Sequence, residues 1–259
     1  MISRTRSYVQ HWRKSQRLHG LHSPFLFELE KEVLDSTKQY YVFSKLEERR
    51  RELLDDHRLI EVTDLGAGSK KLKSSKRKVS QIAKHSLKRP KYAQILFRLV
   101  NKAQPKTVVE LGTSLGVSTL YLSQASSSAS VHSVEGCPQI AGVAEEGFHL
   151  QGAKNIHLHV GDFAEVIPQL LHDLDSIDLL FIDGNHTYEA TVENYQNFVP
   201  KLHHDSVVIL DDIHWSDGME RAWREIKARP EVKVAIDLFE MGILFFQEGI
   251  SKQEHAIRV

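Results

Sequence analysis

The hydrophobic pattern of the chain changes near residue 105. From there on, short apolar runs alternate with segments of helical periodicity, and the runs cover 107–111, 130–134, 155–160, 177–183, 206–212, 232–237 and 242–247. The segments between the first five runs are long enough for crossover connections, which predicts a parallel sheet covered by helices on both faces. Only the four residues "LFEM" separate the last two runs. These two runs therefore predict a terminal antiparallel hairpin.

Residues 1–104 follow a different pattern. Helical spacing of apolar residues recurs in 6–18, 24–36, 45–57 and 90–103, and Pro24 and Pro90 stand where a first helical turn tolerates proline. We predict an α/β domain over 105–259 with a doubly wound, Rossmann-like, seven-stranded and mostly parallel sheet. Residues 1–104 are predicted to form a helical extension, which is also the segment available for a lid.

Charge is divided unevenly along the chain, although the net charge is zero. Residues 1–100 hold 23 Lys and Arg against 11 Asp and Glu, and residues 69–91 alone hold ten basic residues and no acidic one. We interpret 69–91 as a solvated, mobile loop, with binding of an anion or RNA as the alternative. The chain has one cysteine, no apolar run of about 20 residues and no apolar core near its start, so we expect a cytoplasmic protein without a disulfide or a membrane partner.

Two glycine-containing loops compete as the ligand-binding loop. The first carries Gly66 and Gly68 and leads into the basic segment, whereas the second carries Gly112 and Gly116 between an apolar strand and a helix. A nucleotide loop works in that strand-loop-helix context, with an acidic residue about 20 positions later for the ribose, and Glu135 occupies that place. We therefore predict that the second loop binds the ligand and that the first is a flexible break, a hinge for the lid. The G-x-x-x-G spacing of the second loop argues against a dinucleotide.

Five motifs in order resemble those of class I S-adenosylmethionine-dependent methyltransferases, in particular the catechol and caffeoyl-CoA O-methyltransferase group and its bacterial branch. The motifs are "VVELGTSLGVSTLYLS", "VHSVEG", "VGDFAEVIPQL", "IDLLFIDGNHTYE" and "VVILDDIHW", and the resemblance covers roughly residues 105–247. The resemblance implies that S-adenosylmethionine is the cofactor. It also implies that the cofactor-binding positions of these enzymes correspond to positions of this chain. The methionine part would contact Glu110, Gly112, Thr113, Ser114, Gly116 and Ser118; the ribose would contact Glu135; the adenine would contact Asp162 and Phe163; and Asp183 would lie at the cofactor's edge.

Three carboxylates follow the predicted fourth and fifth strands of the α/β domain. Asp183 ends the fourth strand, and Asp211 and Asp212 end the fifth, so a parallel sheet brings them to the same edge. Mg²⁺ relieves the repulsion of such a group, and it would lower the pKa of an acceptor hydroxyl. In the resembled enzymes the matching positions are Asp, Asp and Asn. A group without a metal, in which the carboxylates serve the cofactor edge and a helix cap, is the alternative.

Two histidines are candidates for the catalytic base. His186 stands three residues after Asp183, at the position of the catalytic lysine in the catechol enzyme, and it is either a base or a metal ligand. His214 is the second candidate, and Tyr188 and Trp215 are candidates for walls of an acceptor pocket. The prediction is an O-methyltransferase for a small hydroxylated molecule, with or without Mg²⁺. An RNA methyltransferase and a non-catalytic cofactor-binding protein are the alternatives, and a homodimer is left open.

Overall fold

The computed structural model describes residues 2–15, 24–63 and 74–259. Their contacts divide the chain into two compact units. Unit 1 combines Met1–Leu34 with Leu174–Val259, and unit 2 is Asp35–Asp173. The division at residues 104 and 105 stays a prediction. The proposed hinge at Gly66 and Gly68 lies outside the described residues.

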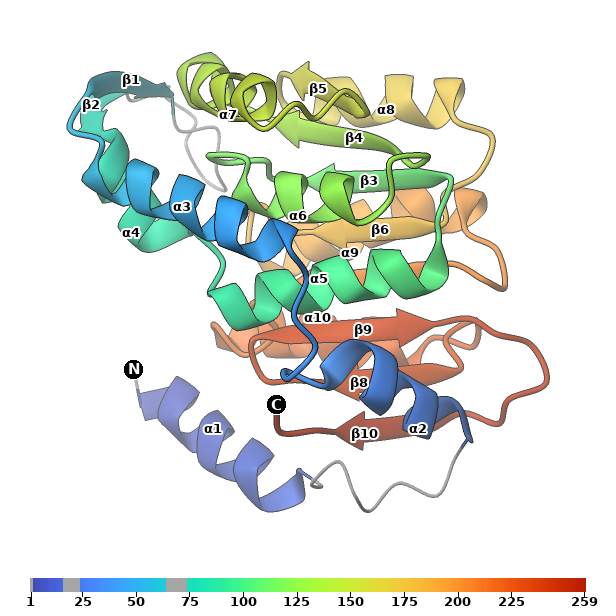
Figure 1. Ribbon diagram of the computed structural model, residues 1–259. Helices are drawn as coiled ribbons and strands as arrows, with labels where there is room; N and C mark the ends of the chain where they lie inside the picture. Colours follow the sequence, from blue (N-terminus) through green and yellow to red (C-terminus); the bar gives the residue numbers. More distant parts are fainter. Residues whose placement is uncertain (1, 16–23, 64–73) are drawn as a thin grey trace. The chain divides into compact units, whose positions relative to one another are not determined.

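Unit 2 begins with helices and a hairpin and continues as alternating strands and helices (Figure 1). Its three parallel strands lie in the order β3-β4-β5, and β1 and β2 pair antiparallel. The register of β3 and β4 places Glu110 opposite Ser133. The elements are α3 (Val42–Asp55), β1 (Leu59–Thr63), β2 (Ser74–Lys78), α4 (Val79–Ser86), α5 (Pro90–Ala103), β3 (Thr107–Leu111), α6 (Val117–Ala125), β4 (Ser130–Glu135), α7 (Pro138–Leu150), β5 (Ile156–Val160) and α8 (Phe163–Asp173).

The early helices of unit 2 are part of its core. One cluster of buried apolar side chains joins α3, α4 and α5 to α6 and α7, with Phe43, Phe97, Tyr121 and Phe148 among its members. The rings of Phe43 and Phe97 meet edge to face with centroids 5.0 Å apart. The lid stays a prediction, and opening α3 to α5 as a lid would expose this core to water.

The basic segment 69–91 is more regular than its sequence suggests. Residues 74–78 form β2 and residues 79–86 form α4, so the prediction of a loop is wrong for both stretches. The helix forms because Val79 and Ala83, four positions apart, are buried in the core, and because the side chain of Gln81 accepts the backbone N–H of Lys78. The helix begins after the most basic stretch, which is why that stretch itself showed no apolar face.

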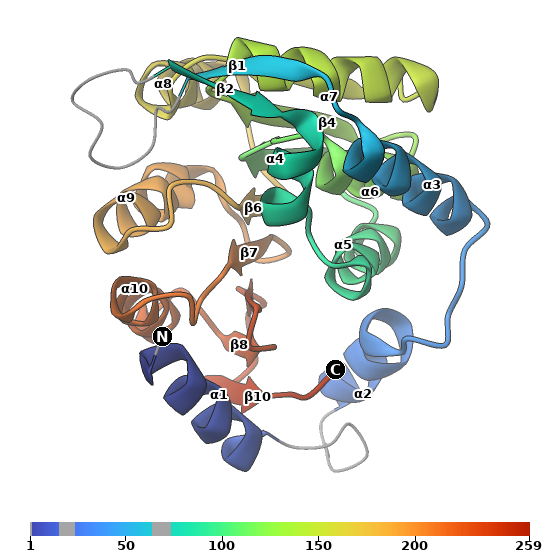
Figure 2. The same cartoon turned by 90° about the vertical axis from the view of Figure 1, so that its left-hand side faces the viewer.

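The described part of unit 1 contains five strands and the helices around them. In it β6 and β7 are parallel, β9 pairs antiparallel with both β7 and β8, and β10 is parallel to β8. Helices α9 and α10 lie on one face of these strands and α2 on the other (Figure 2). The elements are α1 (Ile2–Lys14), α2 (Pro24–Leu29), the π-helix η2 (Glu30–Leu34), β6 (Leu179–Ile182), α9 (Tyr188–Phe198), the 3₁₀-helix η3 (Val199–Lys201), β7 (Val207–Asp211), α10 (Asp217–Ala228), β8 (Val234–Asp237), β9 (Met241–Phe245) and β10 (Gln253–Ala256).

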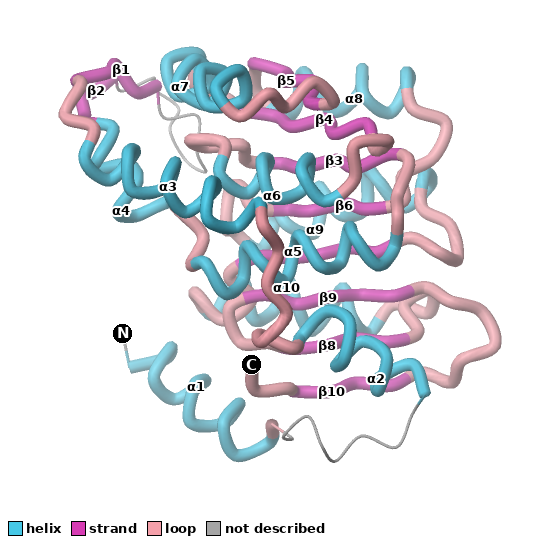
Figure 3. Tube along the Cα trace, viewed as in Figure 1, coloured by secondary structure: helices cyan, strands magenta, loops and turns pink. Residues whose placement is uncertain are grey.

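The predicted α/β fold with a mostly parallel sheet is confirmed. Eight strands belong to one sheet, in the order β10-β8-β9-β7-β6-β3-β4-β5, and the terminal hairpin is β8 and β9 (Figure 3). The count of seven is one short, because β10 has the polar sequence "QEHA" and gives no apolar signal. No helix among the described residues is both long and apolar enough to cross a bilayer. The cytoplasmic location stays a prediction.

Candidate active site

The loop after β3 is shaped by two glycines with positive φ. Gly112 has φ 103°, and its N–H donates to the carbonyl of Val134, 3.0 Å away. Gly116 has φ 80° and precedes the first residue of α6. A Cβ added at Gly116 would lie 2.6 Å from Cε1 of Phe148 and 2.9 Å from Cβ of Ala144, both on α7. The second glycine is therefore required by helix packing as well as by its backbone conformation.

Glu110 is a carboxylate buried inside unit 2. Its side chain is fully buried on β3, and its Oε2 accepts hydrogen bonds from Thr119 at 2.5 Å and from Ser133 at 2.6 Å. Burial raises the pKa of Glu110, while the hydroxyls of Ser118, Ser133 and Thr119 oppose that shift. The other oxygen, Oε1, has no hydrogen-bond partner within the described chain. A buried acceptor of this kind suits a ligand donor such as an ammonium group.

The hydroxyls predicted to bind the cofactor have different surroundings. Thr113 is buried, and its hydroxyl lies 2.5 Å from that of Ser133, within the Glu110 network. Ser114 is only half-buried and donates its hydroxyl to Ser86 at the end of α4, 2.9 Å away. Ser118 is buried beside Glu110. Of these three hydroxyls, that of Ser114 is the most exposed.

Glu135 ends β4 and connects two loops. Its Oε2 accepts the backbone N–H of Ser114 at 2.8 Å, and its Oε1 accepts that of Cys137 at 2.9 Å. Burial raises the pKa of Glu135, and the backbone N–H groups counteract the shift by stabilising the charged form. Each carboxylate oxygen keeps a second lone pair, so the group is able to accept two vicinal hydroxyls as well.

Asp162 and Phe163 lie where α8 begins. The carboxylate of Asp162 accepts the N–H of Ala164 at 2.9 Å, which is the contact of a helix cap. Both side chains are half-buried, so neither is withdrawn into the core. The cap leaves the second carboxylate oxygen of Asp162 for another contact.

In unit 1, the residues after β6 and β7 bring acidic groups and a histidine together. Asp183, His186 and Asp211 each have a potential ligand atom within 4.8 Å of the others. His186 Nε2 lies 3.7 Å from Asp183 Oδ1, and Asp211 is buried. Asp212 does not belong to this group in the described structure: its φ is 50° and its N–H donates to the carbonyl of Glu240. In the described structure the third member of this group is His186, and the metal site of Asp183, Asp211 and Asp212 stays a prediction.

His214 has carboxylates on both ring nitrogens. Nδ1 lies 3.0 Å from Glu220 and Nε2 lies 2.9 Å from Asp237. Burial works to lower the pKa of His214, but the hydrogen bonds and charges of these two carboxylates outweigh it, and the pKa is raised. The ring also stacks on Phe239 at 5.2 Å. This arrangement favours a cationic structural residue, and the catalytic role of His214 stays a prediction.

The two candidate wall residues differ in what surrounds them. The hydroxyl of Tyr188 donates to Glu225 at 2.5 Å, and the guanidinium of Arg221 lies over its ring. Trp215 is 55% exposed, with the guanidinium of Arg4 4.7 Å from its ring centre. Trp215 therefore remains the better candidate for contact with an acceptor.

Comparison with known families explains the order of these groups. Residues 109–213 match a family model described as a methyltransferase domain, and the matched segment begins just before Glu110 and ends just after Asp212. Over these residues the chain is similar to methyltransferase domains. The resemblance inferred from the five motifs is thereby confirmed.

Individual relatives extend the comparison. A mouse protein named transmembrane O-methyltransferase homolog is 33% identical over 129 residues, which are 48% of this chain and 50% of the mouse protein. An uncharacterized protein of Sinorhizobium fredii is 28% identical over 60% of this chain, but over only 18% of its own length. The chain thus spans half or less of these two relatives. A Bacillus cereus O-methyltransferase solved in complex with SAH shares the fold with a TM-score of 0.58 at 14% identity, covering 85% of this chain and 96% of that one.

Several residues that shape the candidate site were missed in the sequence. Within the matched segment, Thr119 and Ser133 complete the Glu110 network. Outside that segment, Ser86 contacts Ser114 and Asp237 binds His214. Ser133 lies opposite Glu110 only because of the β3 and β4 register, which a hydrophobic pattern does not specify.

Proposed function

We propose that this protein is an S-adenosylmethionine-dependent O-methyltransferase acting on a small hydroxylated molecule. The observation that carries the proposal is a pair of carboxylates, the buried Glu110 and the half-buried Glu135, near the loop ends of two adjacent strands in the matched segment. The names of the mouse and Bacillus cereus relatives support oxygen as the acceptor atom.

The residues of unit 2 would hold the cofactor. Glu135 is suited to accept the two ribose hydroxyls, because each of its oxygens already has a fixed position through a backbone N–H. Glu110 is suited to the ammonium of the methionine part, because its Oε1 is a buried acceptor with no partner. Ser114 and Ser118 offer hydroxyls near the same part, and Asp162 with Phe163 would flank the adenine.

The residues after β6 and β7 would act on the acceptor. When bound, S-adenosylmethionine supplies an electrophilic methyl group on a sulfonium sulfur. The acceptor oxygen forms the new C–O bond as the C–S bond breaks, and the acceptor proton passes to a base. We assign that base to His186, which is 30% exposed, rather than to His214, whose nitrogens are both occupied by carboxylates. The carboxylate of Asp183 lies 3.7 Å from His186 Nε2, so its charge would favour the protonated ring that forms when His186 takes the proton.

A divalent cation fits the group of Asp183, His186 and Asp211. Two carboxylates and one imidazole suit Mn²⁺ or Fe²⁺ as well as Mg²⁺, which prefers an all-oxygen set. Bound there, a cation would lower the pKa of the acceptor hydroxyl. His186 then has two exclusive roles, base or ligand, and the two are separable by experiment.

Titration calorimetry with S-adenosylhomocysteine tests the cofactor half. We expect the wild-type chain to bind and Glu135→Gln to bind at least about tenfold more weakly, since the loss of one good polar contact costs about 1.4 kcal/mol or more. Glu145→Gln, an exposed carboxylate on the neighbouring α7, is the matched control and should bind as the wild type does. A correctly folded wild-type chain that fails to bind S-adenosylhomocysteine would refute the proposal.

Methyl transfer to a panel of catechols and other small hydroxylated aromatics tests the acceptor half. The assay is run with Mg²⁺, with Mn²⁺ and with a chelator, on the wild type, Asp183→Asn and His186→Gln. If His186 is the base, His186→Gln loses turnover but keeps cofactor and cation affinity; if it is a ligand, cation affinity falls as well. Cofactor binding with no turnover on any acceptor would instead support the non-catalytic alternative.

A further inference from the structure

A second group of potential metal ligands occupies a tight turn in unit 1. The turn joins η3 to β7, and the N–H of Ser206 donates to the carbonyl of His203, 3.0 Å away. The hydroxyl of Ser206 accepts the N–H of His203 at 2.8 Å and donates to the buried carbonyl of Ile177 at 2.7 Å. The turn is therefore fixed to the strands beside it, which limits the entropy that binding at its tip would cost.

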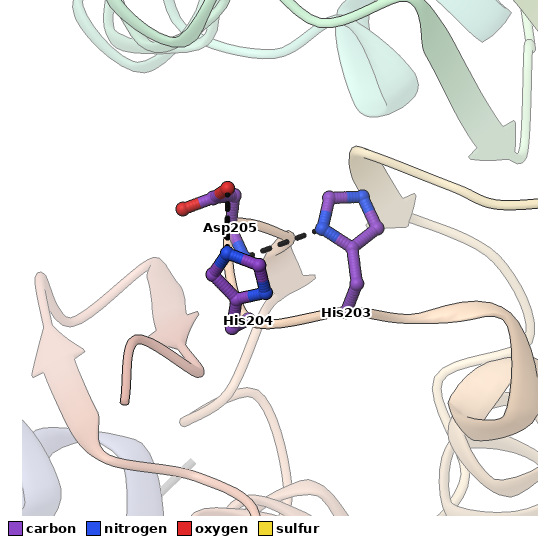
Figure 4. A group of neighbouring side chains, drawn as sticks. All are labelled: His203, His204 and Asp205. Atoms are coloured by element: carbon purple, nitrogen blue, oxygen red, sulfur yellow. Dashed lines mark hydrogen bonds and ion pairs between the residues drawn. The ribbon is translucent and has the colours of Figure 1, made fainter. Parts of the chain in front are cut away.

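Three side chains of this turn converge, and we name His203, His204 and Asp205 the turn cluster. Each offers one ligand atom, and these atoms lie within 4.8 Å of one another. His204 Nε2 lies 3.0 Å from Asp205 Oδ2, and Figure 4 shows the two rings and the carboxylate gathered around one space. His204 and Asp205 are exposed, so solvent reaches that space directly.

The tautomer of His203 prepares it for a metal. The backbone N–H of Asp205 donates to His203 Nδ1 at 3.3 Å, so Nδ1 is the unprotonated nitrogen of the neutral ring. The other nitrogen, Nε2, then donates its proton to Asp178 Oδ1 at 3.0 Å. Histidines that bind metals usually donate their second N–H to a carboxylate or carbonyl in this way. The long contact to Asp205 N is the only one of these bonds that a metal at Nδ1 would displace.

The turn cluster lies at the opposite end of the strands from the catalytic group. Asp178 immediately precedes β6 and Ser206 precedes β7, whereas Asp183 and Asp211 lie at the carboxyl ends of these parallel strands. Five residues of extended strand separate the two ends by roughly 16 Å. One ion cannot serve both groups.

We propose that the turn cluster is a second metal site, which binds a divalent transition-metal ion such as Zn²⁺, Cu²⁺ or Ni²⁺ through the two histidines and Asp205. Two imidazoles and one carboxylate select these ions over Mg²⁺ and Ca²⁺, which prefer oxygen ligands alone. Three protein ligands on an exposed turn leave the remaining coordination positions to water. The proposal does not depend on the proposed methyltransferase reaction.

Calorimetric titration of the full chain with ZnCl₂ in metal-free buffer tests the site, with His186→Gln as the background so that the catalytic group does not contribute. In that background we expect His204→Ala to lose one class of Zn²⁺ sites and Asp205→Asn to weaken the same class by at least about tenfold. His172→Ala is the matched control. His172 is also an exposed histidine beside an aspartate, but no second histidine is adjacent to it in the sequence, so this variant should leave Zn²⁺ binding unchanged.

Cu²⁺ electron paramagnetic resonance provides a second measurement on the same proteins. Two nitrogen couplings that are both lost in the double variant His203→Ala/His204→Ala would support the site even if the turn shifts slightly. Unchanged Zn²⁺ binding in both His204→Ala and Asp205→Asn would overturn the proposal. A Cu²⁺ signal that retains its nitrogen couplings in the double variant would overturn it as well.

Discussion

At the scale of single residues, the candidate site depends on two carboxylates, the buried Glu110 and the half-buried Glu135. Among the described residues, hydroxyls donate hydrogen bonds to Glu110 and backbone N–H groups donate to Glu135, and the charge of Lys88 also works to lower the pKa of Glu110. Burial raises the pKa of both groups, so the unliganded fold bears an electrostatic cost that a cationic or hydroxylated ligand would relieve. The same residues that weaken the fold alone are therefore those suited to bind the cofactor.

Gly116→Ala should destabilise the protein by about 1–3 kcal/mol, because the new methyl group would overlap Phe148 and Ala144 and because φ 80° is unfavourable for alanine. Denaturant unfolding of the purified variant measures this. Gly142→Ala is the matched control: it lies on α7 with open space around it, and the greater helix propensity of alanine should stabilise the protein by up to about 1 kcal/mol. Equal stability of the two variants would show that the packing at Gly116 is not restrictive.

Much of this site was predictable from sequence, and what was not has a physical explanation. The loop, Glu110 and Glu135 follow from a strand-loop-helix pattern with an acid at the next strand end, because that pattern is local. Asp212 follows Asp211 in the sequence, yet the group in the described structure joins His186 to Asp183 and Asp211. Backbone dihedrals and strand register are set by tertiary contacts, which a pattern of apolar residues does not report.

At the scale of elements, helix α1 also has tertiary contacts that a pattern of apolar residues does not report. Its spacing predicted a helix, but the helix buries Ser7 and His11 and exposes Tyr8 and Trp12. It is attached to the rest of unit 1 through a polar contact, in which His11 Nε2 lies 3.2 Å from Asp237 Oδ1. The eighth strand, β10, was missed for a related reason, because an edge strand needs no apolar face.

The buried contact between His214 and Asp237 should make stability depend on pH. The pKa of His214 is raised, so its contribution is complete below its ordinary value of about 6.5 and is lost as pH rises through the higher folded value. The pKa of Asp237 is lowered despite its burial, because His11 and His214 hydrogen-bond to it; its contribution is complete above about 3.9 and is lost only as pH falls through the lower folded value. The cluster of His11, His214, Glu220 and Asp237 should thus stabilise most between these limits.

We expect the unfolding free energy of the wild type to fall between pH 6 and pH 9, and this fall to be smaller in His214→Gln. Denaturant unfolding at a series of pH values measures it. His172→Gln, which removes an exposed histidine beside Asp173, should keep the wild-type slope. A His214→Gln slope equal to that of the wild type would mean that the buried cluster does not control the pH dependence.

At the scale of the whole molecule, the fold redistributes the charge that first suggested nucleic acid. Along the sequence, residues 1–100 carry a balance of +12, but unit 2 holds 20 Lys and Arg against 15 Asp and Glu, and unit 1 holds 14 against 19. The formal net charge is therefore +5 for unit 2 and −5 for unit 1. The basic segment 69–91 belongs to unit 2, which also contains the acidic residues Glu110, Glu135 and Asp162. The negative charges of this unit partly compensate the positive charge of the basic segment.

This redistribution predicts that RNA binding is weak and lacks specificity. In gel-shift titrations at about 150 mM salt we expect affinities no tighter than the 10⁻⁴–10⁻⁶ M typical of non-specific contacts. The double variant Lys76→Ala/Arg77→Ala, on exposed β2 positions, should leave methyl transfer to small acceptors unchanged. Specific RNA binding well below that range, with a steep dependence on salt that this variant reduces, would instead favour an RNA methyltransferase. The acceptor would then be sought among RNA hydroxyls, with the same Glu135→Gln variant as the cofactor control.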